Sequence, residues 1–207
     1  MSLALVRTVV GAAVLAVASF SSQASLIVNG DFEANPINPN SWTWKPSSEV
    51  PGWQGSNIEI WNSMNGVQAM TGNHFIELNA HGGNTGAWSI FQSFATDIGQ
   101  SYELSFYYRA RNGSNEQFEV TVADLSQTLN EHTNQGWSFF SSSFVATDTN
   151  TTLRFTSHNS GTIGNFLDGV SVVAQQGVAA VSAPATFGVF AAGLLALGLT
   201  RRSRHKG

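Results

Sequence analysis

A strict alternation of apolar and polar side chains over residues 101–110 does most to limit what this chain can fold into. Every second side chain there is apolar or aromatic: Tyr102, Leu104, Phe106 and Tyr108. Residues 118–122 show the same period of two, which places one face of an extended strand in a core. No helical stripe longer than about two turns occurs between 26 and 174. The pattern therefore predicts an all-β body.

Further short strands are expected between turns rich in Gly and Asn, at 58–61, 75–78, 88–94, 137–144, 152–157 and 165–173. About eight or nine short strands in roughly 150 residues favour a two-sheet β-sandwich or jelly roll. The sequence contains no Cys, so disulfide scaffolds, zinc ribbons and cysteine nucleophiles are excluded. We expect one domain over residues 25–174.

The first 24 residues are typical of a secretory signal peptide. Arg7 supplies a positive charge, an uncharged apolar stretch follows, and Ser22-Gln23-Ala24 forms a small-x-small cleavage site. The alternative, an uncleaved anchor, needs a longer apolar run. We expect signal peptidase to cleave after Ala24, which places the mature protein outside the cytoplasm.

The other end of the chain has the pattern of a membrane helix. An uncharged linker at 175–183 leads to an apolar segment at 187–200, and four basic residues follow it. Extended back to Val178, the segment just crosses a bilayer of about 30 Å at about 1.5 Å per residue. Basic residues after the helix predict that this end faces the cytoplasm and the domain lies outside.

The C-terminal residues 184–207, with the preceding Ser182-Ala183-Pro184-Ala185, resemble the PEP-CTERM sorting signal of Gram-negative bacteria. The likeness lies in the order of a Pro motif, a Gly/Leu/Ala-rich helix and a basic tail, although Ser-Ala-Pro-Ala replaces Pro-Glu-Pro. It implies a precursor held in the inner membrane, an exosortase that removes the helix, and delivery to the cell surface, outer membrane or extracellular matrix. A permanent C-terminal anchor is the alternative.

Five motifs in order make residues 26–174 resemble the galactose-binding-like jelly rolls of carbohydrate-binding modules and plant cell-wall proteins. They are Asn29-Gly-Asp-Phe-Glu33, Val50-Pro-Gly-Trp53, Gly72-Asn-His-Phe-Ile-Glu-Leu78, Gln100-Ser-Tyr-Glu-Leu-Ser-Phe106 and Phe166-Leu-Asp-Gly-Val-Ser-Val172. The resemblance implies a structural calcium ion with Glu33 and Asp168 as ligands and Asp31 as a third. Calcium takes six to eight oxygen ligands. Alternatively, Asn29-Gly30 is a simple turn and these carboxylates are solvated.

All six Trp residues lie in the body, where charged residues are rare and Asn, Gln, Ser and Thr are frequent. Indole faces stack on sugar rings and amides hydrogen-bond their hydroxyls, so this composition suits a neutral polyol ligand. We assign Trp53, Trp88 and Trp137 to structure. The candidate sugar-binding residues are Trp42 and Trp44 in a loop, Trp61 with the nearby Asn62 and Asn65, and Arg109. Arg109 and Arg111 could instead form salt bridges at a strand end.

The charge pattern and the missing motifs exclude other functions. Thirteen carboxylates lie between Asp31 and Asp168 against four basic residues, a net charge of about −9 that disfavours nucleic acid. No hydrolase nucleophile, zinc-protease or phosphate-binding motif occurs. Glu59 and Glu77 could form a glycosidase-like carboxylate pair, but carboxylates that are solvated or hydrogen-bonded are the simpler interpretation.

The sequence therefore predicts an exported, non-catalytic protein that binds extracellular polysaccharide. Two alternatives stay open: a structural surface or biofilm-matrix protein without specific sugar binding, and, with less support, a polysaccharide hydrolase.

Overall fold

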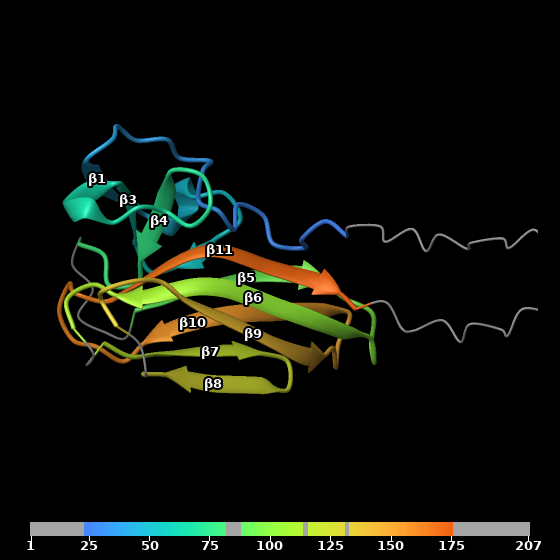
Figure 1. Cartoon of the computed structure of the whole chain (residues 1–207). Helices are drawn as coiled ribbons and strands as arrows, with labels where there is room; N and C mark the ends of the chain where they lie inside the picture. The colour runs from blue at the N-terminus through green and yellow to red at the C-terminus, as the bar shows by residue number, and fades with distance from the viewer. Residues whose placement is uncertain (1–22, 82–87, 114–115, 131–132, 176–207) are drawn as a thin grey trace, which may run out of the picture.

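Two antiparallel sheets form the body of this computed structural model, which describes residues 23–81, 88–113, 116–130 and 133–175 (Figure 1). The six-stranded sheet has the order β1 (Ser41–Lys45), β3 (Ile58–Asn62), β4 (His74–Glu77), β11 (Asn165–Ala174), β6 (Ser101–Ala110) and β9 (Ser138–Val145). The five-stranded sheet has the order β2 (Gln54–Gly55), β5 (Ser89–Ala95), β10 (Asn150–Ser157), β7 (Phe118–Val122) and β8 (Leu125–Leu129). Two 3-10 turns complete the elements, η1 (Ser47–Glu49) and η2 (Met64–Gly66). The predicted all-β two-sheet sandwich is confirmed.

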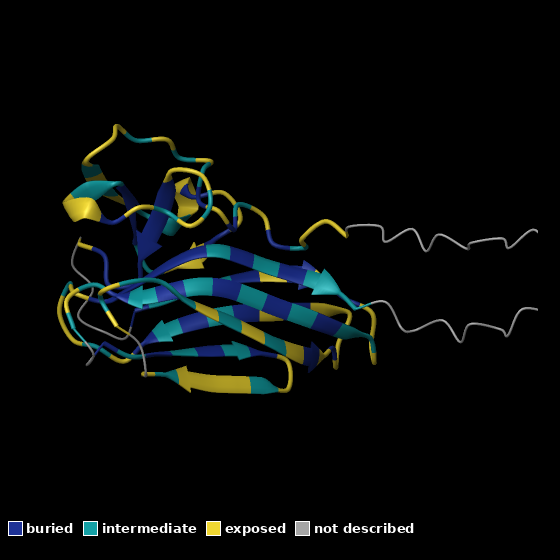
Figure 2. Cartoon of the chain, in the orientation of Figure 1, coloured by how far each residue is buried: buried dark blue, intermediate teal, exposed yellow. Residues whose placement is uncertain are grey.

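The main core lies between the sheets, and the alternation in the sequence produces it. Buried and partly exposed residues alternate along the whole of β6 (Figure 2). Phe106 of β6 meets Phe155 of β10 edge to face, with ring centroids 5.1 Å apart. Aromatic pairs in this geometry add to the free energy that burial alone supplies. The period of two therefore decides which face of each strand enters the core.

The prediction for residues 41–45 was wrong, because they form the edge strand β1 and not a loop. Every residue of β1 has a partner on β3, from Ser41 opposite Asn62 to Lys45 opposite Ile58. The short β2 and β8 were also missed. β8 alternates in no clear way and its three central residues are exposed, so it carries little hydrophobic pattern.

The first and last motifs of the family resemblance meet in the structure. The Val170 N–H donates a hydrogen bond of 2.9 Å to the Gly30 carbonyl, and the Leu26 N–H donates one of 2.8 Å to the Val172 carbonyl. A Cβ atom on Gly30 would lie 2.0 Å from the Val170 carbonyl oxygen, so only glycine fits there. The indole N–H of the buried Trp53 donates to the Asn29 carbonyl, which supports its structural assignment.

Residues 1–22 of the predicted signal peptide, most of the 175–183 linker and the sorting motif Ser182–Ala185 with its helix lie outside the described residues. Within the described ranges, no helix has the length and apolar character needed to span a bilayer.

Candidate functional site

A cavity of about 410 Å³ lies on the face of the six-stranded sheet that points away from the main core. Its walls come from β3, from the segment around η2, and from three further segments. These are the end of β6 with the loop after it, the loop before β9, and the start of β11 with the loop before it. The lining residues are Trp61, Asn65, Val67, Arg109, Arg111, Asn112, Asn134, Ile163 and Phe166. Three of the predicted sugar-binding residues, Trp61, Asn65 and Arg109, therefore meet in one cavity.

The floor of this cavity is a second aromatic cluster, separate from the main core. It consists of Trp61, Phe75, Phe166 and Val67. The ring centroids of Phe75 and Phe166 are 4.9 Å apart, and those of Trp61 and Phe166 are 5.2 Å apart. Trp137 is partly buried and meets Phe75 edge on. Met64 of η2 packs against the cluster, so this segment covers the outer face of the sheet.

Trp61 is therefore not an open stacking platform, contrary to the prediction. It is only 1% exposed, because the Arg111 guanidinium lies 4.9 Å above its ring and Trp42 stacks beside it at 6.3 Å. The prediction for Asn62 is also wrong. This side chain is buried and donates to the Ile37 carbonyl at 3.0 Å, so its amide holds the chain before β1.

Trp42 and Trp44 project to the same side of β1 and remain 37% and 44% exposed. Trp42 lies between Trp61 and His81, and the ring centroids of Trp42 and His81 are 5.2 Å apart. Trp44 is opposite Glu59 in the register with β3. The open indole surface thus continues outward from the buried cluster toward the edge of the sheet.

The two arginines in the cavity wall differ in what compensates their charge. Arg111 Nη1 lies 3.1 and 2.9 Å from the two carboxylate oxygens of Glu77, which is the strand-end salt bridge that the sequence left open. Arg109 donates through Nη2 to the Asn134 carbonyl and lies 5.9 Å above the Trp137 ring. Among the described residues Arg109 forms no ion pair, and its buried Nε has no acceptor. Burial lowers the pKa of Arg109.

Two carboxylates lie beneath this wall, and neither is solvated. Glu59 accepts a 2.9 Å hydrogen bond from the Trp61 indole and one of 3.1 Å from the His81 N–H. Glu77 accepts one of 2.8 Å from the Gly164 N–H. Burial raises the pKa of Glu77 to about 8; the Gly164 N–H and Arg111 oppose the rise and Glu59 adds to it. The hydrogen-bonded interpretation of these two residues is confirmed.

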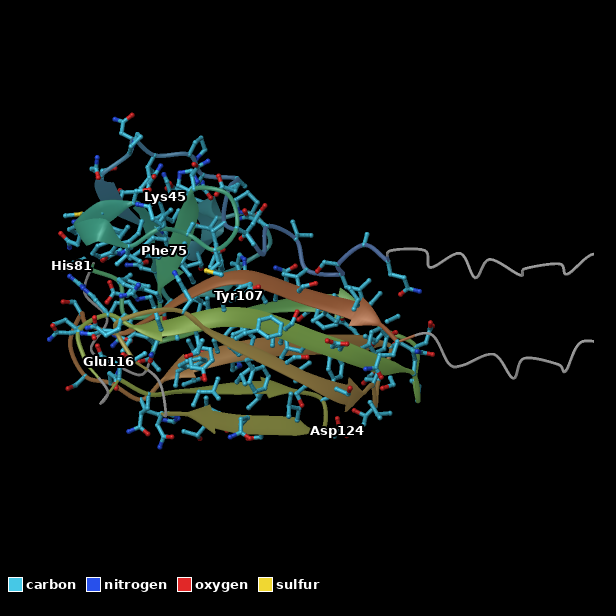
Figure 3. All side chains as sticks on the ribbon, viewed as in Figure 1. Lys45, Phe75, His81, Tyr107, Glu116 and Asp124 are labelled. Carbon is cyan, nitrogen blue, oxygen red and sulfur yellow. The ribbon has the colours of Figure 1, made fainter. Side chains whose placement is uncertain are left out.

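A second cavity of about 410 Å³ adjoins the first, since Asn112 and Ile163 line both. Its other lining residues are Glu116, His158, Asn159 and Ser160. The carboxylate of Glu116 accepts hydrogen bonds from the backbone N–H groups of Asn112 and Gly113 and so shapes the wall between the cavities. Figure 3 shows Glu116 and His81 toward the same end of the sandwich, with Asp124 toward the other.

Sequence reasoning missed Asn112 and Asn134 as lining residues. The Asn134 side-chain amide donates to the Asn112 backbone carbonyl at 2.7 Å, so it joins the loops after β6 and before β9. The Asn112-Gly113 turn directly after the alternating strand was the available signal for Asn112. No local pattern marks Asn134.

Residues 25–173 match the model of a family described as "Protein of unknown function (DUF642)". The chain belongs to the DUF642 family. No curated protein matches the sequence. Similar solved structures include a CBM4 carbohydrate-binding module, with 19% identity and a TM-score of 0.44 over 72% of this chain and 99% of that one. The xylan-binding domain CBM22-1 from Paenibacillus barcinonensis has 17% identity and a TM-score of 0.46, with 76% of this chain and 100% of that one covered. An arabinose-bound α-L-arabinofuranosidase has 14% identity and a TM-score of 0.49, with 73% of this chain and 26% of that one covered.

In this DUF642 domain the predicted calcium ligands hold the loop before β4. Asp168 accepts four hydrogen bonds, from the Met70, Thr71 and Gly169 N–H groups and from the Thr71 hydroxyl, at 2.6 to 2.8 Å. Burial nevertheless raises the pKa of Asp168.

Glu33 accepts hydrogen bonds from the Asn73 and His74 N–H groups and contacts His74 Nδ1 at 2.6 Å. Burial pushes the pKa of Glu33 up, but these hydrogen bonds outweigh it, so its pKa lies below the ordinary value. Asp31 is exposed.

The three carboxylates do not fit a shared calcium ion in this arrangement, because N–H and O–H donors already surround Glu33 and Asp168. Across the described ranges, no three His, Asp or Glu side chains are grouped as metal ligands. Calcium binding by this chain stays a prediction.

Proposed function

We propose that this domain binds an extracellular glycan without catalysing a reaction on it. The observation that carries the proposal is the cavity whose wall combines Asn65, Asn112 and Asn134 with two arginines above an aromatic floor. Amides supply donors and acceptors for sugar hydroxyls, and arginines supply further donors. The exposed indoles of Trp42 and Trp44 can contact C–H groups. Pockets of this kind fix a ligand's orientation through a few polar groups.

The arrangement suits an oligosaccharide better than a single sugar. Two cavities that share a wall provide adjoining subsites, and the exposed faces of Trp42 and Trp44 extend the surface beyond Trp61. Exposed indoles at the edge of a polar cleft can stack on further sugar rings of the same chain.

The enclosed carboxylates support the absence of hydrolysis. A glycosidase needs two carboxyl groups that reach the bond on both sides of the sugar. Glu59 and Glu77 are each 1% exposed, and the Trp61 indole, the Gly164 N–H and Arg111 occupy their oxygens. They therefore hold the cavity wall together and do not face a substrate.

The sequence signals at the two ends support a cellular setting for this proposal. The signal peptide at 1–24 supports export, and the PEP-CTERM-like segment at 184–207 supports sorting by an exosortase to the surface or exopolysaccharide matrix. Pulse-labelling of the full chain tests both: two processing steps are expected, one at each end. A precursor that keeps its C-terminal segment and stays in the inner membrane would contradict the sorting step.

A glycan array with purified residues 25–175 tests binding, because this fragment contains every strand of both sheets. We expect a coherent set of glycans, with binding weakened in Asn134→Ala and Trp44→Ala. Ser126→Ala, on the exposed β8 of the other sheet, is the matched control. A blank array with a folded domain would contradict the proposal. Release of reducing ends from a bound glycan would contradict the non-catalytic part.

One observation favours the alternative of a matrix protein that assembles with itself. β9 forms the edge of the six-stranded sheet, its sequence Ser138–Val145 has no charge and no Pro, and Phe139 is 58% exposed. Uncharged edge strands are prone to pair with another chain. Sedimentation without glycan tests this alternative: self-association that Phe139→Lys abolishes would favour it, and a monomer at all concentrations would count against it.

A further inference from the structure

Arg109 is the one feature of the cavity wall that glycan hydroxyls alone do not explain. It lies two residues before Arg111 at the end of β6, and both side chains line the same cavity. Glu77 lies 2.9 Å from Arg111, whereas no carboxylate among the described residues lies within ion-pair distance of Arg109. Arg109 is therefore the arginine of this wall that has no carboxylate partner in the described part of the domain.

This charge is held in place and partly removed from water. The guanidinium lies over the Trp137 ring and donates to the Asn134 carbonyl. Its Nε atom is buried and has no hydrogen-bond acceptor. A buried or half-buried cation without a partner lowers stability, and an anion placed beside it restores the lost interaction. A rigid arginine in a cavity is suited to a planar carboxylate, which it can bind through parallel N–H groups.

We propose that Arg109 makes this cavity selective for glycans that carry a carboxylate, the class of uronic-acid polysaccharides. The inference rests on the proposed function and specifies the substrate class of the same site. The amides would bind the hydroxyls of the uronate ring, and Arg109 would bind its carboxylate.

The acidic groups near the cavity do not oppose such a ligand. Glu77 is engaged with Arg111, and the oxygens of Glu116 accept the N–H groups of Asn112 and Gly113. More distant carboxylates of this acidic body act weakly, since charges farther than about 8 Å are largely screened at physiological salt. Local charge at the wall therefore decides the interaction.

Paired ligands test the inference on residues 25–175. The probes are trimers of galacturonate, glucuronate and mannuronate, each compared by calorimetry with its own methyl ester, which has the same sugar rings but a neutral methylated carboxyl group. We expect at least one acid to bind about tenfold to a hundredfold more tightly than its ester, the range of a charge-assisted hydrogen bond. Arg109→Gln should remove this preference, and Arg109→Lys should retain part of it.

Arg154→Gln is the matched control, because Arg154 also lies over an aromatic ring, that of Phe91 on the other sheet. It should leave the preference unchanged. Thermal melts confirm that each variant is folded, and in the wild type the preference should shrink as salt is added. Equal binding of acid and ester, or a preference that survives in Arg109→Gln, would overturn the inference while glycan binding stands. If neutral glycans bind and no acid does, the inference alone fails; if no glycan binds, the proposed function fails with it.

Discussion

Glu59 and Glu77 are direct cross-strand neighbours on β3 and β4, and both side chains are buried on the outer face of the sheet. Like charges directly opposite each other destabilise a sheet. Here a single cation, Arg111, lies against Glu77, and the Trp61 indole donates to Glu59. A proton kept on Glu77 relieves this repulsion, and Glu59 is accordingly one of the causes that raise the pKa of Glu77.

The pKa of Glu77 predicts how stability depends on pH. Burial raises it from 4.5 to about 8. Between these values the unfolded chain has lost a proton that the folded chain keeps, so stability should fall as pH rises from about 4.5 to about 8. The fall is on the order of 4 kcal/mol, since one pKa unit corresponds to about 1.4 kcal/mol. Urea unfolding across this range measures it. Glu77→Gln should flatten the curve, and an unchanged pH profile in that variant would contradict the assignment.

Truncation to Ala should lower the free energy of unfolding strongly at Trp61 and hardly at all at Trp44. Trp61→Ala opens a cavity within the aromatic cluster and should lower the free energy of unfolding by about 3 to 5 kcal/mol. Trp44→Ala removes an exposed ring and should change it by less than about 0.5 kcal/mol. Chemical denaturation of both variants provides the test. If Trp61→Ala keeps wild-type stability, its ring does not hold the outer face together.

Gly30 should tolerate no side chain. Its position fixes the N-terminal turn against β11, where a Cβ atom would meet the Val170 carbonyl oxygen. Gly30→Ala should break the hydrogen bond between Val170 and Gly30 and lower the unfolding free energy by about 2 kcal/mol or more. Gly136→Ala, with nothing within 4 Å of its Cβ position, is the control. Equal thermal melting temperatures for the two variants would show that the turn can move away.

Local pattern sufficed for the sandwich but not for the site. The alternation in β6 and β7 depends on each strand's own side chains, so it was readable from the sequence. β1 is a strand because β3 pairs with it, and its five residues contain no buried position that would have indicated this. The pairing of β1 with β3 therefore produces no hydrophobic pattern in the five residues of β1.

The burial of Trp61 shows the same limit for function. Trp61 was predicted at the surface because Asn62 and Asn65 follow it, but η2 folds back over the outer face and Arg111 covers the ring. The grouping of Asn65 and Arg109 in one cavity also depends on this fold-back. The sequence identified Asn65 and Arg109 as candidates, whereas their grouping and exposure depend on contacts between residues far apart in sequence.

Asp168 should act as a structural clamp. Its four donors belong to residues 70–71 and 169, so it ties the loop before β4 to the final strand. Asp168→Asn replaces an acceptor oxygen by an N–H donor that faces other donors and leaves buried N–H groups unsatisfied. We expect a loss of about 2 to 4 kcal/mol in unfolding free energy, measured by urea denaturation. A near-neutral effect would mean that water replaces the carboxylate.

Chelation separates this clamp from the calcium site that the family resemblance implies. A calcium ion at Glu33 and Asp168 would have to displace the N–H and O–H donors that now surround both carboxylates. We therefore expect EDTA to leave the thermal melting temperature of residues 25–175 unchanged. Asp31→Asn should also have little effect, because Asp31 is exposed and accepts only a long hydrogen bond of 3.4 Å from the Glu33 N–H. A melting temperature that drops in EDTA, recovers with added calcium and becomes insensitive to calcium in Asp31→Asn would instead establish the ion. In that case the loop at 70–74 must rearrange to expose its carboxylate partners.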